Sequence, residues 1–454
     1  MKSFDDQGTP VLLQRTQLHA CLGDPLLGAM SFLNEIMDRH PKAISFAPGA
    51  PHAEFFEEVD VPRALERYAR HLEREHGMDQ RQIDKQLYQY GPSRGQINGL
   101  LAEALRRDEG IDVAPDALVV TVGCQEAMLL VLRALCAGAD DLLAIVNPCF
   151  VGIGGAARVL DIGTVAIEES DDGIDWNGLE AACAAARKQG RRIRALYVAP
   201  DFSNPSGAIL DLAGRHRLLA LAAREDFLIL EDNAYAFTAL PGSALPTLKA
   251  LDRSARVVYL GTCAKICMPG VRIGYAVADQ RVAAADGTIR LLADELAAIK
   301  SMITVNTSPI CQAIFAGILL EHGGSLAQLG RSKAALYQRN LGLLLAGLER
   351  HAGALAADGT ISWNAPAGGF FVRMRLPVAA DSALLERCAA DYGVLWTPMS
   401  HFFLDGGGLR QLRLSCSYLT PEQIDEGARR LARFLRDPQV RSAVPQRHPA
   451  RRAA

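Results

Sequence analysis

The sequence predicts an α/β fold with a mostly parallel β-sheet. Over the middle of the chain, short continuous apolar runs rich in β-branched residues alternate with amphipathic stretches rich in Ala and Leu, a pattern typical of buried parallel strands separated by helices. The 454 residues are 49% hydrophobic and 22% charged, which is enough apolar material for a large core. Because the pattern changes near residue 310, we expect a second, smaller α+β domain.

The strands and helices expected in the large domain follow one another in order. ALVVTVG (117–123) reads as a strand, and QEAMLLVLRALCAG (125–138) as the helix after it. Further buried strands are expected at 141–148, 192–201, 227–233 and 255–262, with a helix at 212–226.

Longer helices and shorter strands follow in the last third. Helices are expected at 311–323, 325–353 and 421–437, and strands at 368–376 and 409–418. We therefore assign residues 61–320 to a large domain and 321–437 to a small one, to which residues 1–60 contribute. The remaining residues, 438–454, are rich in Arg and Pro and contain no acid, which predicts a disordered tail.

Charge and cysteine usage exclude several classes of protein. The net charge of −3 favours neither nucleic acid nor an anionic membrane as a partner. No apolar run approaches the roughly 18 residues of a membrane helix, and Asp5, Asp6 and Arg15 interrupt the region where a signal peptide has its apolar segment. We expect a cytoplasmic protein.

Its ten cysteines show no CxxC pair and no zinc-finger spacing, so reduced core thiols and no metal site are expected.

Polar residues, together with one glycine before a helix, follow the carboxyl ends of the expected strands, where open α/β sheets bind ligands. They are Gly123, Cys124 and Gln125 at a helix start, then Asn204, Asp232, Tyr235, Thr262, Lys265 and Arg272. Each alone is a weak signal, since an Asn-Pro is usually a turn and a lone lysine is usually solvated.

Together these residues are the parts that a pyridoxal phosphate site needs. A lysine forms the Schiff base and moves the substrate α-proton. A carboxylate holds the pyridine nitrogen protonated, Tyr and Asn bond the ring hydroxyl, and a helix start with Thr and Arg binds the phosphate.

Five segments, in the expected order, resemble the class I/II aminotransferases, which are fold-type I pyridoxal-phosphate enzymes. They are YGPSRG (90–95), SNPSG (203–207), EDNAY (231–235), GTCAKICMPGVRIGY (261–275) and LRLSCSY (412–418). The resemblance covers residues 44–434 and implies a large, mostly parallel sheet of the seven-stranded type, an amino acid and a 2-oxo acid as substrates, and a homodimer with shared active sites.

Carried over by position, the resemblance makes Lys265 the Schiff-base lysine and Asp232 the partner of the pyridine nitrogen. Tyr235 and Asn204 would bond the ring oxygen, and Arg413 would bind the substrate carboxylate with help from the backbone near Gly49. The other implied cofactor contacts are Gly123, Cys124, Gln125, Thr262 and Arg272 around the phosphate, Phe150 on the ring face, and Tyr90 from the neighbouring subunit.

Three further segments are similar to transaminases that make phenylglycine-type amino acids in specialised metabolism. They are DPLLGAMSFLNEI (24–36), YQYGPSRGQI (88–97) and TVGCQEAMLLVLRAL (121–135). An aromatic or apolar substrate is favoured by the Phe residues expected to line the pocket, although core packing accounts equally well for most of them: Phe55, Phe56, Phe150, Phe402 and Phe403.

The chain also departs from the family pattern. Cys124 stands where Ser is common, so the backbone must supply more of the phosphate contact. Cys267 and Met268 are expected near the cofactor, and Met399, which replaces a Gly, is expected to narrow or reshape the pocket. His401 is expected to be packed or solvated, with an acid/base or substrate-binding role as the alternative.

One other kind of reaction stays open on sequence grounds, and two other functions are disfavoured. The same scaffold can direct the α-carbanion to elimination, replacement, C–C bond formation or oxidation. A transcriptional regulator with a fused aminotransferase-like domain would need an N-terminal winged helix, for which the residues before Ile44 are too few. GIGGA (152–156) lacks the register of a dinucleotide-binding motif and indicates close helix packing instead.

Overall fold

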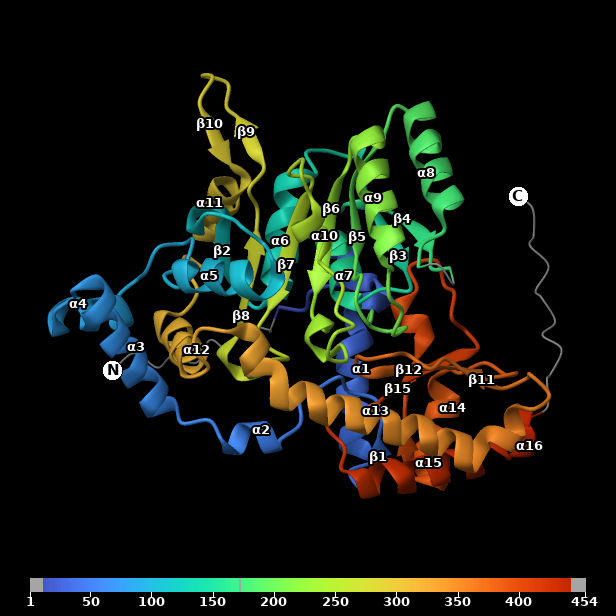
Figure 1. Ribbon diagram of the computed structural model, residues 1–454. Coiled ribbons are helices and arrows are strands. Elements are labelled where there is room, and N and C mark those ends of the chain that lie inside the picture. Colours follow the sequence, from blue (N-terminus) through green and yellow to red (C-terminus); the bar gives the residue numbers. More distant parts are fainter. Residues whose placement is uncertain (1–10, 171–172, 442–454) are drawn as a thin grey trace, which may run out of the picture.

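The computed structural model describes residues 11–170 and 173–441, and in that part of the chain the largest sheet has seven strands (Figure 1). In spatial order they are β2 (Leu118–Val122), β8 (Ile273–Val277), β7 (Val257–Thr262), β6 (Leu228–Asn233), β5 (Arg192–Val198), β3 (Asp141–Asn147) and β4 (Gly163–Glu168). Only β8 runs antiparallel to its neighbours. The expected mostly parallel sheet is confirmed.

Helices cover both faces of this sheet (Figure 1). On one face lie α6 (Cys124–Leu135), α7 (Val151–Val159) and α11 (Leu292–Ile303). On the other lie α3 (Val61–His76), α5 (Asn98–Glu109), α8 (Trp176–Lys188), α9 (Leu212–Glu225), α10 (Leu248–Leu251) and α12 (Pro309–Glu321). Successive strand residues alternate between the two layers, so most positions of β2, β3, β6, β7 and β8 are buried and these strands read as continuous apolar runs.

The smaller unit is built on a four-stranded antiparallel sheet. Its order is β11 (Ser362–Trp363), β12 (Phe371–Arg375), β15 (Gln411–Ser415) and β14 (Thr397–Pro398). Helices α13 (Leu326–Ala356), α14 (Ser382–Arg387) and α15 (Pro421–Leu435) contribute to its core. The N-terminal strand β1 (Ile44–Ser45) pairs in parallel with β13 (Val394–Leu395), which agrees with a contribution from residues 1–60. The domain boundaries themselves stay a prediction.

Six further α-helices and β-strands are described. They are α1 (Pro25–Arg39), α2 (Glu54–Glu57), α4 (Gln80–Tyr88), the hairpin β9 (Arg281–Ala283) and β10 (Ile289–Leu291), and α16 (Pro438–Arg441). Helix α16 occupies the first four residues of the segment expected to be disordered, because Val440 is buried in the core of the small unit. The rest of that segment, 442–454, lies outside the described residues.

Several smaller expectations can be checked against the structure. All ten cysteines are free and seven are buried, which confirms reduced core thiols. A Cβ on Gly154 of α7 would lie 2.9 Å from side-chain atoms of Leu26 and Leu404, so the glycines of GIGGA do serve close packing. Among the described residues no single helix is long and apolar enough to cross a membrane; α12 and α13, bent by 82° at their junction, meet the length and composition criteria only as a pair.

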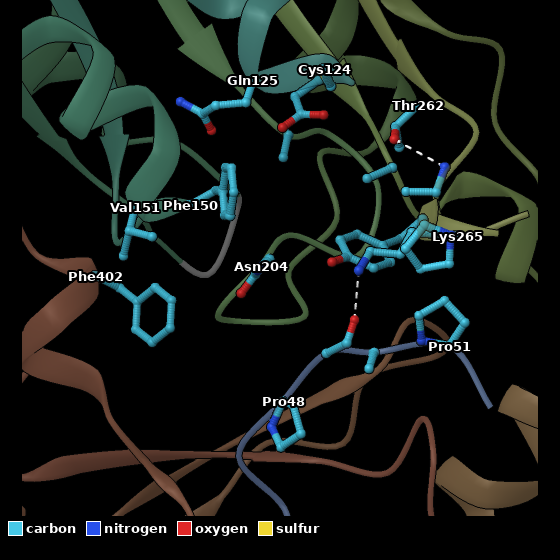
Figure 2. Close-up of a pocket in the computed structure, with 18 of the residues that line it drawn as sticks. Pro48, Pro51, Cys124, Gln125, Phe150, Val151, Asn204, Thr262, Lys265 and Phe402 are labelled. Carbon is cyan, nitrogen blue, oxygen red and sulfur yellow. Dashed lines mark hydrogen bonds between the residues drawn. The ribbon is translucent and has the colours of Figure 1, made fainter. Parts of the chain in front are cut away.

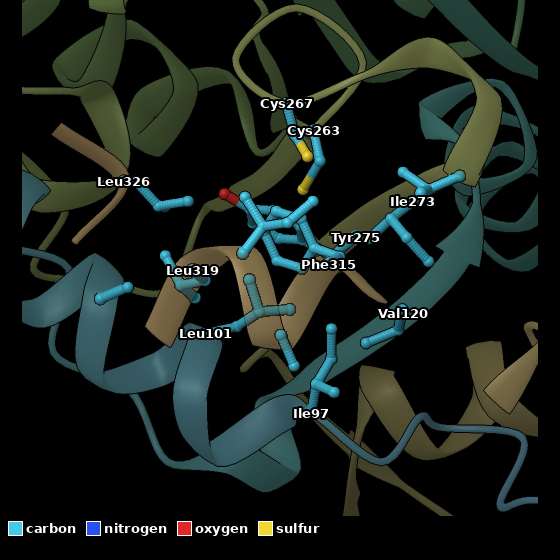
Figure 3. Close-up of a cluster of buried hydrophobic side chains, with 14 of the residues drawn as sticks. Ile97, Leu101, Val120, Cys263, Cys267, Ile273, Tyr275, Phe315, Leu319 and Leu326 are labelled. Atoms are coloured by element: carbon cyan, nitrogen blue, oxygen red, sulfur yellow. The ribbon is translucent and has the colours of Figure 1, made fainter. Parts of the chain in front are cut away.

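One buried cluster joins α3, α5 and α12 to the β2–β8 side of the large sheet. Figure 3 shows Phe315 and Leu319 of α12 among side chains of α5, β2 and β8. Helices α3 and α12 approach so closely that a Cβ on Gly317 would lie 1.9 Å from the backbone oxygen of Ala64. Because that oxygen belongs to a helix backbone, it cannot move aside cheaply.

The substitution Gly317→Ala is therefore expected to lower the free energy of unfolding by about 3 kcal/mol, the upper end for overpacking. The matched control is Gly342→Ala on the exposed side of α13, where an added Cβ meets nothing within 4 Å. It is expected to raise stability by roughly 0.5–1 kcal/mol through helix propensity. The free energy of unfolding of both variants, measured in urea, tests this prediction. An equal change in stability for Gly317→Ala and Gly342→Ala would contradict the packing argument.

Candidate active site

A pocket of about 400 Å³ opens beyond the carboxyl ends of β5, β6 and β7, between the large sheet and the small unit. It is lined by Met37, Ala47, Pro48, Gly49, Ala50, Pro51, Cys124, Gln125, Met128, Phe150, Val151, Tyr197, Ala199, Asn204, Asp232, Ala234, Tyr235, Thr262, Ala264, Lys265, Pro269, Arg272, Phe402 and Arg413. The structure thus brings together eleven of the thirteen residues expected at the site; Gly123 and Tyr90 are the exceptions.

Lys265 follows β7 and extends its side chain into the pocket (Figure 2). Its Nζ donates a hydrogen bond to the backbone oxygen of Gly49 at 2.6 Å. Burial, together with the positive charges of Arg413 and Arg272, lowers the pKa of the Lys265 amine to about 8. A substantial fraction of this amine is therefore neutral near pH 7–8, and only the neutral form is a nucleophile or a base.

Asp232 lies near the end of β6 and is buried. Desolvation raises the pKa of its carboxyl group to about 6, and a hydrogen bond from Tyr197 works in the opposite direction. The Tyr197 hydroxyl donates to Oδ2 of Asp232 at 2.5 Å. Tyr197 was missed in the sequence analysis, although a phenol within the apolar run RALYVAPD was a usable signal.

The start of α6 and Arg272 form a cradle for an anion. Gly123, at φ +73°, precedes the helix, and a Cβ there would lie 2.2 Å from Nη2 of Arg272. A Cβ on Gly274 would lie 2.4 Å from the backbone nitrogen of Cys124. Two glycines therefore allow a guanidinium group and a strand to approach a helix N-terminus, whose free N–H groups suit a phosphate.

Arg413 projects from β15 and is held on several sides. Nη1 donates to Oδ1 of Asn204, and Nη2 to the backbone oxygen of Ala47, each at 2.6 Å. The guanidinium carbon lies 4.4 Å from the ring centre of Phe371 and 4.6 Å from that of Phe402. Burial lowers the pKa of Arg413 to about 10, and its buried Nε has no hydrogen-bond partner among the described residues.

The charges around the pocket do not balance. Among its described lining residues, Arg272, Arg413 and the protonated fraction of Lys265 carry positive charge, and Asp232 is the single carboxylate. Buried charges are costly unless paired. An anionic cofactor at Arg272 and a substrate carboxylate at Arg413 would supply the missing charge, so the donor set fits pyridoxal phosphate together with an α-amino acid.

The remaining wall is apolar. Figure 2 shows Phe150, Val151 and Phe402 on the side of the pocket opposite Lys265. Met399 does not line the pocket; it is buried behind Phe402 and Val151, so it shapes this wall only from behind. Met399 therefore does not narrow the pocket directly, and its expected reshaping of the pocket can act only through the contacts with Phe402 and Val151.

Other expected neighbours of the pocket lie elsewhere. Gly123 stands behind the lining, where its backbone N–H donates to the carbonyl oxygen of Arg272. Tyr90 is 83% exposed and lies outside the pocket. Phe55 is buried against Tyr337, Phe56 is exposed, and Phe403 packs beside the pocket without lining it.

Cys267 and Met268 pack in the cluster of Figure 3, and His401 does not line the pocket.

The comparisons with known proteins agree with this geometry. Residues 58–431 match the family model of aminotransferase class I and II. The chain belongs to the class I and II aminotransferases. It is a pyridoxal-phosphate-dependent aminotransferase, an enzyme that moves an amino group between an amino acid and a 2-oxo acid.

Three similar proteins illustrate the range of this family. The aminotransferase is 46% identical over 432 residues to the (S)-3,5-dihydroxyphenylglycine transaminase of Amycolatopsis orientalis, an alignment that covers 95% of this chain and 97% of the relative. It superposes on the multiple substrate aminotransferase of Thermococcus profundus with TM-score 0.74 at 28% identity, covering 89% of this chain and 94% of the other.

The third is LysN, the alpha-aminoadipate aminotransferase of Thermus thermophilus, solved with N-(5'-phosphopyridoxyl)-L-leucine. Its TM-score is 0.72 at 28% identity, with 91% of this chain and 96% of LysN covered. The fold-type I assignment made from the sequence motifs is thereby confirmed.

Proposed function

We propose that this aminotransferase interconverts an arylglycine and the corresponding 2-oxo-2-arylacetic acid. The observation that carries the proposal is the pocket wall: beyond Arg413 it is formed by Phe150, Val151, Phe402 and Met128, and the described lining has no cation left for a second substrate carboxylate. The 46% identity to a dihydroxyphenylglycine transaminase supports the same substrate class. The transaminase names of the relatives favour amino transfer over elimination or oxidation at the same carbanion.

We infer that pyridoxal phosphate occupies the pocket. The cradle formed by α6, Thr262 and Arg272 would hold its phosphate, and Phe150 would lie against its ring. Tyr235, which lines the pocket together with Asn204, would contact the ring oxygen. When bound there, the cofactor supplies an aldehyde that joins to amines and a ring that accepts the electron pair left by the α-proton.

Protein groups perform the remaining work of the proposed reaction. Arg413 binds the substrate carboxylate with its fork of N–H groups and so fixes the orientation of the α-carbon. The neutral amine of Lys265 would be the base beside that carbon; it would take up the α-proton and deliver it to the cofactor carbon bonded to the amino nitrogen. Asp232 keeps the pyridine nitrogen protonated, and the apolar wall excludes water around the aryl group.

We further propose a homodimer in which Tyr90 reaches the partner subunit's pocket. Exposed apolar side chains support this: Tyr88, Tyr90, Val305 and Ile310 lie on segments 88–96 and 305–312, which contact each other. Such a concentration of exposed apolar surface is typical of protein interfaces. We expect these dimers in the cytoplasm.

The substrate proposal predicts a preference of at least about 100-fold in kcat/KM for (S)-phenylglycine and its hydroxylated forms over L-aspartate. An unpaired carboxylate in an apolar pocket costs several kcal/mol, and each ~1.4 kcal/mol is a factor of ten. Steady-state kinetics with one common 2-oxo acid acceptor measures the ratio.

The controls for this measurement are two neighbouring phenylalanines. Phe402→Leu alters the pocket wall and is expected to reduce the preference by about 10-fold. Phe403→Leu, next to the wall but outside the lining, should leave it unchanged. Equal turnover of L-aspartate by the unmodified enzyme would overturn the proposed substrate class.

A further inference from the structure

We propose that Tyr197 is a positioning residue that keeps Asp232 ionised and aimed at the pyridine nitrogen of pyridoxal phosphate, an inference that rests on the proposed function. Neither the sequence motifs nor the family resemblance had pointed to Tyr197. It comes from the middle of the sheet, on the strand next to the one that carries Asp232.

The strand register puts the two side chains on one face of the sheet. Tyr197 of β5 pairs with Leu230 of β6, and Asp232 follows two residues later, so its side chain points to the same face as that of Leu230. The phenol therefore extends along the sheet toward the carboxyl ends of the strands. Its hydroxyl reaches Oδ2 of Asp232 at 2.5 Å, which leaves Oδ1 for another partner in the pocket.

The surroundings of this carboxylate give it little other support. Tyr197 is 1% exposed and Asp232 is 7% exposed, so water contributes little. Cys124 on α6 and Tyr235 after β6 also interact electrostatically with Asp232; burial raises the pKa of both, so neither carries charge near neutral pH. Among these groups, the Tyr197 hydroxyl is the one whose hydrogen bond lowers the pKa of Asp232.

Loss of that hydrogen bond has a definite chemical consequence. A more basic Asp232 draws the proton away from the pyridine nitrogen, and a neutral pyridine ring accepts electrons less readily than a pyridinium ring. The α-proton would then be harder for Lys265 to remove. Tyr197→Phe is therefore expected to lower kcat by about 10- to 100-fold, the range for a hydrogen bond to a charged group, with little change in KM.

The chain contains a closely matched control. Tyr259, on β7 beside β6, is also 1% exposed, and its hydroxyl donates to Oε2 of the half-buried Glu109 at 2.6 Å. Neither Tyr259 nor Glu109 lines the pocket. Tyr259→Phe thus removes a hydrogen bond from a buried phenol to a carboxylate without touching Asp232, so it measures the general cost of such a loss.

The test is the protonation state of the cofactor, read by nitrogen NMR on enzyme reconstituted with pyridoxal phosphate that carries ¹⁵N in its ring. We expect a protonated ring nitrogen in the unmodified enzyme and in Tyr259→Phe, and a shift toward the neutral value in Tyr197→Phe. The dissociation constant of the cofactor, from titration of the apoenzyme, should rise about 10-fold in Tyr197→Phe alone. Circular dichroism and melting temperature establish that each variant is folded.

Two results would overturn the inference while leaving the proposed function intact. One is a ring nitrogen that stays fully protonated in Tyr197→Phe with unchanged cofactor affinity, which would make Tyr197 a packing residue. The other is an equal shift in Tyr259→Phe, which would make the effect a general loss of rigidity. Failure of the unmodified protein to bind pyridoxal phosphate would instead refute the proposed function on which the inference rests.

Discussion

Lys265→Ala is expected to lower the rate of amino transfer by at least about 10⁴-fold, the upper end of what one acid–base group contributes. The reason is that Lys265 has two tasks: its amine binds the cofactor covalently, and it moves the α-proton once the substrate has displaced it. Its burial and its lowered pKa, about 8, suit both tasks, because each needs the neutral amine. Single-turnover kinetics with saturating amino acid measures the loss.

A second buried lysine serves as the control for this substitution. Lys333 on α13 is 8% exposed, its Nζ donates to the backbone oxygen of Leu329, and burial lowers its pKa as well. It does not line the pocket. Lys333→Ala should therefore keep amino transfer within a few-fold of the unmodified enzyme. Retention of more than a few per cent of the rate by Lys265→Ala would contradict the assignment of Lys265.

Arg413→Lys is expected to lower kcat/KM by about 100-fold or more for both the amino acid and the 2-oxo acid, mainly through KM. Lysine keeps the charge but loses the planar fork that binds a carboxylate through two parallel hydrogen bonds, and each hydrogen bond to a charged group contributes about 1.5–3 kcal/mol. It would also leave the oxygens of Asn204 and Ala47 without their 2.6 Å partners.

The neighbouring strand offers the matched substitution. Arg373 of β12 lies directly opposite Arg413 in the sheet, and its guanidinium pairs with Glu169 at 3.1 Å outside the pocket. Arg373→Lys should change kcat/KM by less than about threefold, since a lysine can maintain an ion pair of this kind. Equal effects of the two substitutions on KM would show that Arg413 acts on the fold and not on the substrate.

Much of the architecture could be predicted because the parallel strands are buried on both faces. β3 and β7, for example, read as DLLAIVN and VVYLGT, and such continuous apolar runs have few alternative interpretations. β8 was recognised only as part of the lysine motif, since its antiparallel pairing with β2 and β7 depends on contacts between residues far apart in sequence. Helix α16 was missed because its burial depends on tertiary packing of Val440, which a Pro- and Arg-rich sequence does not reveal.

Site residues that directly follow the ends of strands could be predicted from the sequence. Residues whose positions depend on contacts between distant parts of the chain could not. Asp232, Thr262 and Lys265 stand at carboxyl ends of strands, which meet at one edge of the sheet. Tyr197 belongs to the interior of a strand, so its contact with Asp232 follows only from the pairing of β5 with β6. Phe55 and Cys267 are near pocket residues in sequence, but the strand and helix geometry directs them into separate clusters.

The most direct test of the central claim is the absorption spectrum of the purified enzyme before and after an arylglycine is added without any 2-oxo acid. The account predicts that the band of pyridoxal phosphate bound to Lys265 is replaced by that of pyridoxamine phosphate, with release of one equivalent of the arylglyoxylic acid. A persistent long-wavelength band, or product formation with the initial band unchanged, would contradict amino transfer and point to another reaction of the α-carbanion. Absence of any pyridoxal phosphate band, even after the cofactor is added, would contradict the assignment of the pocket itself.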